Sequence, residues 1–390
     1  MKVSYYCQHV LGIGHFHRSL AICREIARRH STTLILGGPP VEVDHPSIEV
    51  LRLPGLQMDS EFNSMVPCAP NLSLDEVKSA RKNLLFNHFK EGAPDVFITE
   101  LYPLGRKAFR FELDPVLEAI DAKVLPPCLC YCSVRDILVE KKTGREKFED
   151  RAVKTLNRYY NGVLIHADPQ VITLEKTFGR LDDINIPLHY TGFVSQQRPD
   201  DALQNIRSKF ALKSKDKLIV ASIGGGNVGS ELLFATIDAF NCLESTSNHH
   251  LQIFSGPYCD EATYIRLQER AGTNITLQRF TDHFPQWLEV ADLSISMAGY
   301  NTCMNLIQAG IPALVYPFDQ NREQRLRAEQ LGKKSAISVL DDQDLQARAL
   351  AQHMLRQFGT PRSPDRININ GAEETAAQLK NWFIQHSHHG

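Results

Sequence analysis

The chain has 390 residues, of which 43% are hydrophobic and 23% are charged, a composition typical of soluble globular proteins. This length predicts two domains, and the formal net charge of -2 argues against a nucleic-acid-binding protein. No apolar run is long enough to span a bilayer, and the N-terminus lacks the parts of a signal peptide, so we expect a cytoplasmic protein. The cysteines include no Cys-x-x-Cys pair, and we expect no bound metal.

Strand-like and helix-like segments alternate from the start of the chain. Residues 2–9 read as a strand, residues 10–15 as a glycine-containing loop and residues 18–29 as an amphipathic helix, with a second strand at 32–36. This order predicts the opening of a doubly wound α/β sheet. Further strands are expected at 48–53, 95–100 and 162–168 and within 123–132, and further helices at 74–90, 113–120 and 145–161.

Polar side chains follow several of these expected strands. His15, Glu100, Arg135 and Asp168 each come just after a strand end. Because the carboxyl ends of parallel strands face the ligand crevice of such a sheet, we expect these side chains to form a site.

The second half of the chain begins like the first. A strand at 217–223 leads into the glycine loop 224–229 and a helix at 231–243, which predicts two similar Rossmann-like domains. Residues 195–201 form a polar, proline-containing stretch typical of a linker. We expect a first domain at 1–193, a linker at 194–209, a second domain at 210–365 and a C-terminal helix and tail at 366–390.

The most informative stretch is 293–318. An apolar strand at 293–297 precedes a tight turn at Ala298 and Gly299, and a short helix then begins at Tyr300. Glycine lets the backbone turn sharply, and the free N–H groups of the helix favour a phosphate or diphosphate. Asn305 lies one turn further on, within reach of a ribose hydroxyl. On this stretch alone, an ordinary strand–helix–strand unit is an equally good interpretation.

Ala-Gly-Tyr-Asn-Thr before a helix, then Gly-Ile-Pro and a Pro-Phe-Asp-Gln loop, resembles the donor-binding segment of glycosyltransferases with the two-domain B-type fold. The resemblance is strongest to MurG-like enzymes and a related group of predicted bacterial glycosyltransferases. Gly12-x-Gly14-His15-x-x-Arg18 resembles their N-terminal loop, and also the loop of nucleotide-sugar hydrolases of the same architecture. The resemblance implies two Rossmann-like domains facing a cleft, with the last helix returning to the first domain.

The resemblance also implies how a nucleotide diphosphate sugar is bound. Backbone N–H groups of 299–302 and 224–227 would hold the diphosphate, so no metal and no cofactor are required. The segment 279–284 resembles the stretch that meets the base, and the charge run that follows, 321–330, otherwise reads as a solvated helix face. The donor-binding residues carried over are Gly14, Gly224, Gly225, Gly226, Asn227, Phe284, Ala298, Gly299, Tyr300, Asn301, Thr302, Asn305, Asp319, Gln320, Glu323 and Gln324. The family usually has Glu where this chain has Asn305.

His15 is the candidate catalytic base, because an imidazole with a pKa of roughly 6.5 takes a proton from a hydroxyl near neutral pH. Glu100 or Asp168 would orient this base or bind the acceptor. Arg18 and Arg135 are candidate acceptor or phosphate contacts. The alternative for His15 is a histidine that only hydrogen-bonds within the cleft.

These features predict a metal-independent, inverting glycosyltransferase that moves a sugar from a nucleotide diphosphate sugar, expected to be a UDP-sugar, to a hydroxyl acceptor that the sequence does not identify. A nucleotide-sugar hydrolase using water in the same cleft is the first alternative. A non-catalytic nucleotide-sugar binding protein is the second, motivated by Asn305. An NAD-linked oxidoreductase is a distant alternative, because the dinucleotide fingerprint around Gly12 and Gly14 is incomplete. Peripheral membrane contact and oligomeric state stay open.

Overall fold

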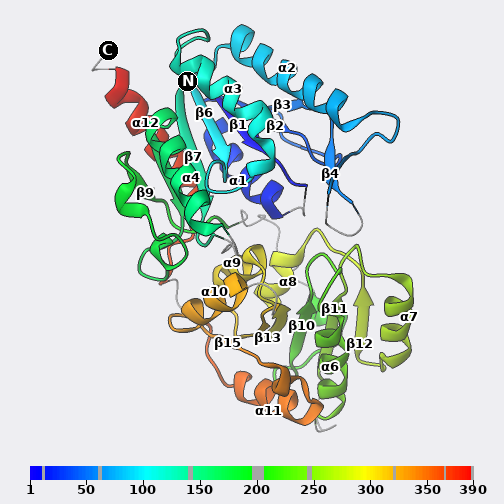
Figure 1. Ribbon diagram of the computed structural model, residues 1–390. Helices are drawn as coiled ribbons and strands as arrows, with labels where there is room; N and C mark the ends of the chain where they lie inside the picture. Colours follow the sequence, from blue (N-terminus) through cyan, green and yellow to red (C-terminus); the bar gives the residue numbers. More distant parts are fainter. Residues whose placement is uncertain are drawn as a thin grey trace. The chain divides into compact units, whose positions relative to one another are not determined.

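Parallel strands alternate with helices through both halves of the chain, as the computed structural model shows (Figure 1). The structure describes residues 1–10, 14–59, 64–138, 144–195, 206–243, 248–318, 322–363 and 366–387. Contacts divide the chain into two units, Met1–Ser195 with Asn368–Gly390, and Gln196–Ile367. The predicted α/β class with a parallel sheet in each half is confirmed.

Unit 1 is built on a seven-stranded sheet of order β3-β2-β1-β6-β7-β8-β9, in which all pairings are parallel. The order reverses between β1 and β6, which is where sheets of this kind bind ligands at their carboxyl edge. The strands are β1 (Lys2–Cys7), β2 (Ser31–Leu36), β3 (Ile48–Arg52), β6 (Val96–Glu100), β7 (Leu129–Arg135), β8 (Gly162–His166) and β9 (Leu188–Tyr190), with β4 (Leu56–Met58) and β5 (Met65–Pro67) as a separate antiparallel pair. The main helices are α1 (Gly14–Ala27), α2 (Leu74–Gly92), α3 (Arg110–Asp121), α4 (Arg145–Tyr159) and α12 (Gly371–Ser387).

The structure defines the bounds of two elements of unit 1 more closely than the sequence did. Helix α1 begins at Gly14, so His15 lies in its first turn and not in the preceding loop. Strand β7 begins at Leu129, because Pro126 and Pro127 before it have no N–H to donate to a sheet. It also runs on to Arg135, which is therefore the last strand residue.

The C-terminal helix α12, red in Figure 1, belongs to unit 1 and packs against α1. Trp382 is buried and stacks on Tyr131 of β7, with the ring centroids 4.8 Å apart. The returning chain is fixed by two backbone bonds to Phe193, from the Phe193 N–H to the Asn368 carbonyl (2.8 Å) and from the Gly371 N–H to the Phe193 carbonyl (2.9 Å). The last helix therefore stabilises both the sheet and helix α1, which carries the candidate base.

Unit 2 has a six-stranded parallel sheet of order β12-β11-β10-β13-β14-β15, which reverses between β10 and β13. Its strands are β10 (Leu218–Ser222), β11 (His250–Phe254), β12 (Ile275–Gln278), β13 (Leu293–Met297), β14 (Ala313–Tyr316) and β15 (Ile337–Val339). Its helices are α5 (Ile206–Lys209), α6 (Ser230–Asn241), α7 (Glu261–Arg270), α8 (Phe284–Val290), α9 (Tyr300–Ala309), α10 (Arg322–Gly332) and α11 (Ala347–Gln357).

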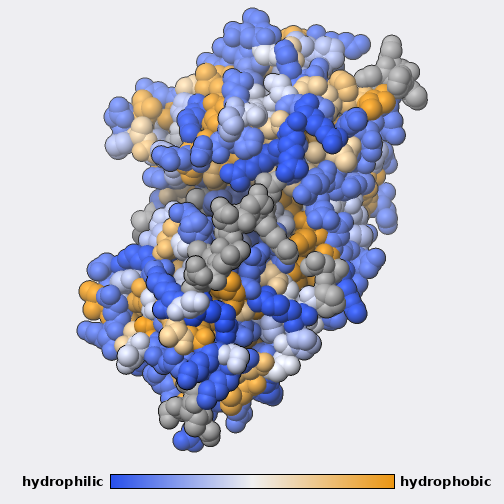
Figure 2. All heavy atoms as spheres, turned by 180° about the vertical axis from the view of Figure 1, so that it is seen from behind, coloured by the Kyte–Doolittle hydropathy of each residue, from blue (hydrophilic) through white to orange (hydrophobic). Residues whose placement is uncertain are grey.

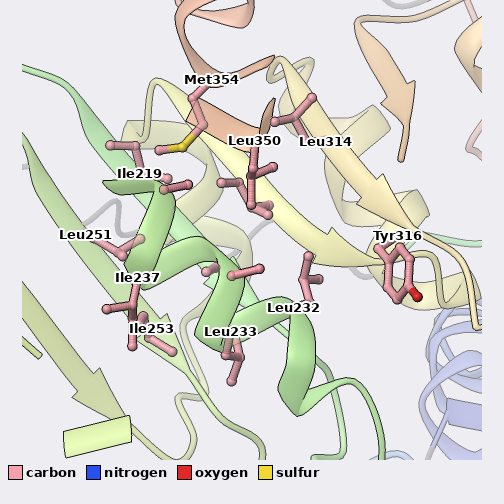
Figure 3. Packing of buried hydrophobic residues seen from close by; sticks show 14 of the residues in the cluster. Ile219, Leu232, Leu233, Ile237, Leu251, Ile253, Leu314, Tyr316, Leu350 and Met354 are labelled. Atoms are coloured by element: carbon pink, nitrogen blue, oxygen red, sulfur yellow. The ribbon is translucent and has the colours of Figure 1, made fainter. Parts of the chain in front are cut away.

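The core of unit 2 lies between its sheet and helices α6 and α11 (Figure 3). Leu233 and Ile237 of α6 face Leu251 and Ile253 of β11, and Met354 of α11 packs beside them. Burying such side chains contributes about 1.5–3 kcal/mol each. This core holds β10 and β13 side by side and so fixes the two loops that follow them.

The surface gives no sign of a membrane-spanning element in the part of the chain that is described. None of the helices there combines the length and the apolar character needed to cross a bilayer. On the face shown in Figure 2, hydrophilic side chains cover most of the surface and hydrophobic ones lie in small groups between them.

Candidate active site

The candidate base lies at the point where the strand order of unit 1 reverses. β1 and β6 pair in parallel, with Tyr6 opposite Thr99, so the chain after Cys7 and the side chain of Glu100 meet at the same edge of the sheet. Helix α1 then presents His15 and, three residues later, Arg18 on one face.

His15 and Glu100 form a hydrogen-bonded pair. His15 Nδ1 lies 2.7 Å from Glu100 Oε1, and Arg18 Nη2 lies 2.6 Å from the same oxygen. Because a carboxylate only accepts, Nδ1 carries the hydrogen, and Nε2 is left with its lone pair. The 3.2 Å approach of Arg18 Nη2 to His15 Nδ1 is then a close contact and not a hydrogen bond, since both atoms carry hydrogens. The Glu100 side chain is fully buried, whereas that of His15 is 19% exposed.

The charge states of this pair leave Nε2 of His15 unprotonated at neutral pH, although the lowered pKa makes His15 a weaker base than the ordinary imidazole expected from the sequence. Burial is the main cause that lowers the pKa of His15 to about 4; Glu100 opposes it by favouring protonation, and the charges of Arg106 and Arg18 add smaller effects in the same direction as burial. Burial alone would raise the pKa of Glu100, but His15, Arg106 and Arg18 together hold it well below its ordinary range. At neutral pH a neutral imidazole therefore faces an ionised carboxylate.

A buried polar chain lies behind the pair. Tyr5 Oη is 2.8 Å from Ser133 Oγ, which is 2.7 Å from His166 Nε2, and His166 Nδ1 is 2.9 Å from Thr191 Oγ1. Ser133 lies opposite Glu100 in the sheet, and its carbonyl accepts the Leu101 N–H at 2.8 Å. Burial lowers the pKa of His166 to about 3, so the ring is neutral. These hydrogen bonds join side chains of β1, β7 and β8, and β1 and β7 are the strands on either side of β6, which ends at Glu100.

The other predicted residues of unit 1 have the following places and contacts. Arg135 Nε donates to the Ile137 carbonyl at 3.1 Å. Asp168 accepts the backbone N–H groups of Gln170 (2.8 Å) and Asn368 (2.9 Å), so it anchors the returning chain. Gly14 is the first residue of α1, and Gly12 lies outside the described residues.

Sequence reasoning missed Arg106. Its side chain is 8% exposed, and its Nε lies 3.6 Å from Glu100 Oε2. The available signal was its place in the loop that follows a strand ending in a carboxylate.

In unit 2 the glycine loop follows β10. Gly226 has φ +94, and a Cβ there would lie 2.6 Å from the Ser255 carbonyl oxygen, so this glycine is required by backbone packing. Gly224 has φ +70 with nothing within 4 Å of a Cβ, and Gly224, Gly225 and Asn227 are exposed. The exposed part of the loop is therefore accessible to a ligand.

Helix α9 begins at Tyr300, directly after β13 and the predicted turn. Its N-cap residue is Gly299, which has no side chain to cap the first amides, and its first helical bond runs from the Cys303 N–H to the Gly299 carbonyl (2.9 Å). The expectation that Gly299 makes an unusually sharp turn is wrong, because its φ of -65 and ψ of 152 are open to any residue. Ala298 is buried, and Asn301 and Thr302 are half-buried. The arrangement leaves a helix N-terminus suited to an anion.

The side chains predicted to surround the donor differ in burial and in their contacts. Asn305 is buried, and its Oδ1 has no hydrogen-bond partner among the residues described. The Phe284 ring packs edge-on against Phe254 (centroids 5.9 Å apart), whereas Phe280, which the prediction did not single out, is 61% exposed. Gln324 Oε1 accepts the Phe318 N–H at 3.0 Å.

The remaining predicted residues belong to helix α10 and to the segment that precedes it in the sequence. Glu323 lies in the first turn of α10. Asp319 and Gln320 lie outside the described residues. The reading of the following charges as solvated is wrong for Arg327, which is 1% exposed and lies 5.2 Å from the centre of the Tyr300 ring.

Comparison with known proteins agrees with this fold. Solved structures that resemble the chain include the glycotransferase of kitacinnamycin, with TM-score 0.60 and 14% identity, over 99% of this chain and 95% of that one. The MurG structure from Acinetobacter baumannii has TM-score 0.58 and 14% identity, over 99% of this chain and 100% of that one. The chain therefore has the predicted MurG-like fold of B-type glycosyltransferases.

The family model that matches is the glycosyltransferase family 28 C-terminal domain, over residues 220–380. A curated relative is the UDP-N-acetylglucosamine--N-acetylmuramyl-(pentapeptide) pyrophosphoryl-undecaprenol N-acetylglucosamine transferase of Bacillus licheniformis, which is 25% identical over 182 residues, 45% of this chain and 50% of the relative. The chain spans about half the length of the curated relatives it matches. The predicted resemblance to MurG-like glycosyltransferases is confirmed.

Proposed function

We propose that the protein is a glycosyltransferase that moves a sugar from a nucleotide diphosphate sugar to a hydroxyl acceptor. The observation that carries this proposal is the match of residues 220–380 to the glycosyltransferase family 28 C-terminal domain. That range contains the glycine loop, the start of α9 and the first turn of α10.

On the donor side, the diphosphate binds at the N-terminus of α9 and the exposed part of the glycine loop. Backbone N–H groups and the helix dipole stabilise the negative charge that grows on the leaving nucleotide, without a metal ion. The name of the curated relative specifies UDP-N-acetylglucosamine, which supports a UDP-sugar as the first donor to test.

On the acceptor side, His15 Nε2 takes the proton of the acceptor hydroxyl. The hydroxyl oxygen then forms a bond to the anomeric carbon while the bond from that carbon to the diphosphate oxygen breaks, so the anomeric centre inverts. Glu100 holds the Nδ1–H tautomer and stabilises the imidazolium that forms. The relative's name specifies a pyrophosphoryl-undecaprenol acceptor, which supports including a lipid-linked acceptor, and hence peripheral membrane contact, among the tests.

The test begins with a panel of nucleotide sugars in a thermal-shift assay, because a ligand that binds only the folded state raises the melting temperature. The best donor is then assayed for transfer to a panel of acceptors and for hydrolysis without acceptor. His15→Gln should abolish transfer and leave donor binding unchanged. His189→Gln is the matched control, because His189 also faces a carboxylate, that of Glu374 at 3.3 Å, but lies 30% exposed outside this site.

Three outcomes decide between the candidate functions. Slow donor hydrolysis with acceptor-dependent transfer supports the glycosyltransferase. Fast, stoichiometric release of free sugar without acceptor would identify a nucleotide-sugar hydrolase, and tight donor binding without turnover would identify a binding protein. The absence of any donor-dependent shift would exclude all three.

A further inference from the structure

Arg106 lies in a strained loop directly beside the candidate base. The loop leaves β6 at Glu100, and both Leu101 (φ 64) and Arg106 (φ 51) have left-handed backbone conformations. Such conformations are costly for residues other than glycine and persist where the surroundings impose them. The loop is held by the Leu101 N–H on the Ser133 carbonyl (2.8 Å) and by Thr99 Oγ1 on the Tyr102 carbonyl (2.8 Å).

The two oxygens of Glu100 have different partners. Oε1 contacts both His15 and Arg18, whereas Oε2 is buried and accepts no hydrogen bond from the described residues. The cation that faces Oε2 is Arg106, with Nε at 3.6 Å, and its buried Nε and Nη2 likewise lack hydrogen-bond partners in the described ranges. The link between them is therefore one of charge. Without it, the buried Glu100 carboxylate would be compensated at one oxygen only, which is costly.

The charges around His15 do not cancel. The charged groups that act on it are Glu100 at the end of β6, Arg18 on α1 and Arg106 in the loop after β6, which sum to one net positive charge. A carboxylate alone would favour the imidazolium and so occupy Nε2 with a proton. Burial is the largest cause that keeps the imidazole neutral, and of the two arginines that add to it Arg106 has the larger effect.

We propose that Arg106 is a positioning residue for the base: it holds Oε2 of Glu100 so that Oε1 stays against Nδ1 of His15 and Nε2 is left available to the acceptor. This inference rests on the proposed function, since it assigns His15 the role of base. It also predicts that the site keeps its base form in mildly acidic conditions.

The test measures the protonation and tautomer of His15 by NMR of protein labelled with ¹⁵N at histidine, with His15→Gln used for assignment. The variants are Arg106→Gln, which removes the charge, and Arg106→Lys, which keeps it. Arg110→Gln is the matched control, because Arg110 lies close by in the sequence, at the start of α3, but is 43% exposed and paired with Asp114 at 2.9 Å.

In the wild-type protein His15 should carry its hydrogen on Nδ1 and titrate near pH 4. In Arg106→Gln the pKa of His15 should rise by about one unit or more toward its ordinary value, while Arg106→Lys and Arg110→Gln stay close to wild type. An unchanged titration in Arg106→Gln would overturn the proposal. If that variant does not fold, Arg106→Lys decides: a wild-type titration supports the role of the charge, and a shift to the ordinary histidine value contradicts it.

This experiment is independent of turnover. If His15→Gln left transfer intact while Arg106→Gln still shifted the titration, the proposed role of His15 would fail and the electrostatic role of Arg106 would stand. If His15→Gln abolished transfer and Arg106→Gln did not shift the titration, the proposed role of His15 would stand and the electrostatic role of Arg106 would fail.

Discussion

Arg81 of α2 and Glu112 of α3 form a fully buried ion pair, with Arg81 Nη2 2.6 Å from Glu112 Oε1 and neither side chain exposed. The same guanidinium donates to the carbonyls of Gly37 (2.8 Å) and Pro54 (2.7 Å) and to Gln8 Oε1 (2.9 Å). One side chain thus joins two helices to the loops after β2 and β3 and to the chain that leaves β1 toward His15.

Replacing Arg81 should therefore be strongly destabilising. Arg81→Met leaves Glu112 buried without its charged partner, with the hydroxyl of Tyr6 still donating to it, and we expect a loss of about 3–5 kcal/mol in the free energy of unfolding. Arg158→Met is the control, because Arg158 pairs with Asp121 at 3.3 Å on the surface, where the two side chains are 65% and 43% exposed. It should cost less than about 1 kcal/mol in the same urea titration. Equal losses in the two variants would contradict the role given to Arg81.

Removing the carboxylate that orients the base should lower activity without loss of donor binding. In Glu100→Gln the amide no longer favours the Nδ1–H tautomer, and we expect kcat to fall by about 100-fold or more. The dissociation constant of the nucleotide should stay within about twofold, because the proposed donor contacts lie in unit 2. Steady-state kinetics and calorimetry on the same preparation check this, and a fall in donor affinity with kcat unchanged would argue against the assignment.

The buried histidines predict a loss of stability in acid. The pKa of His15 and of His250 is lowered to about 4, and that of His166 to about 3, in each case chiefly by burial. The unfolded chain binds these protons near pH 6.5 and the folded protein does not. The contribution of these neutral histidines to the free energy of unfolding should therefore be complete above about pH 6.5 and should be lost as the pH falls toward 4.

Chemical denaturation at about pH 7.5 and pH 5 measures this fall, since each unit of pKa shift corresponds to about 1.4 kcal/mol. His15→Gln should reduce the difference between the two values, because it removes one of the groups that drive it. Equal stability at both pH values would show that these histidines titrate normally in the folded protein.

Three glycines near the proposed diphosphate should respond differently to alanine. Gly226→Ala places a Cβ 2.6 Å from the Ser255 carbonyl at φ +94, so we expect a loss of about 3 kcal/mol or more. Gly224→Ala meets only the left-handed backbone and should cost about 1–2 kcal/mol. Gly299→Ala has room, with its nearest contact at 3.8 Å, and should leave stability unchanged. If the start of α9 binds the diphosphate, Gly299→Ala should weaken pyrophosphate binding in calorimetry all the same.

Local patterns were enough to predict the strands and the ends where polar side chains emerge. The apolar run that ends at Glu100 and the glycine-containing segment before Arg18 placed both residues near the correct edge, because parallel strands of one sheet share their carboxyl side. The same logic predicted the glycine loop after β10 and the helix that begins at Tyr300.

Features set by contacts distant in sequence could not be predicted. The charge pattern of 321–330 predicted a solvated Arg327, but the side chain is buried beside the Tyr300 ring. The sequence did not indicate that Asp168 also accepts a hydrogen bond from the backbone of Asn368, 200 positions away. No sequence pattern indicated a role for Arg106, because its place beside Glu100 depends on the path of the loop after β6.

Asn305 provides the last prediction, on nucleotide recognition. Its buried Oδ1 has no partner among the described residues, and it lies one turn into the helix whose N-terminus is the proposed diphosphate site. If a hydroxyl of the nucleoside donates to Oδ1, Asn305→Ala should lose about 1 kcal/mol, or about five- to tenfold in affinity for UDP. Pyrophosphate affinity should not change, since that ligand lacks the nucleoside.

Asn241→Ala is the matched control, because Asn241 is an exposed asparagine at the end of α6. Calorimetry with UDP and with pyrophosphate on both variants separates the cases. A parallel loss of affinity for both ligands in Asn305→Ala would mean that Asn305 acts by supporting the helix start, and an unchanged affinity for UDP would remove Asn305 from the nucleotide site altogether.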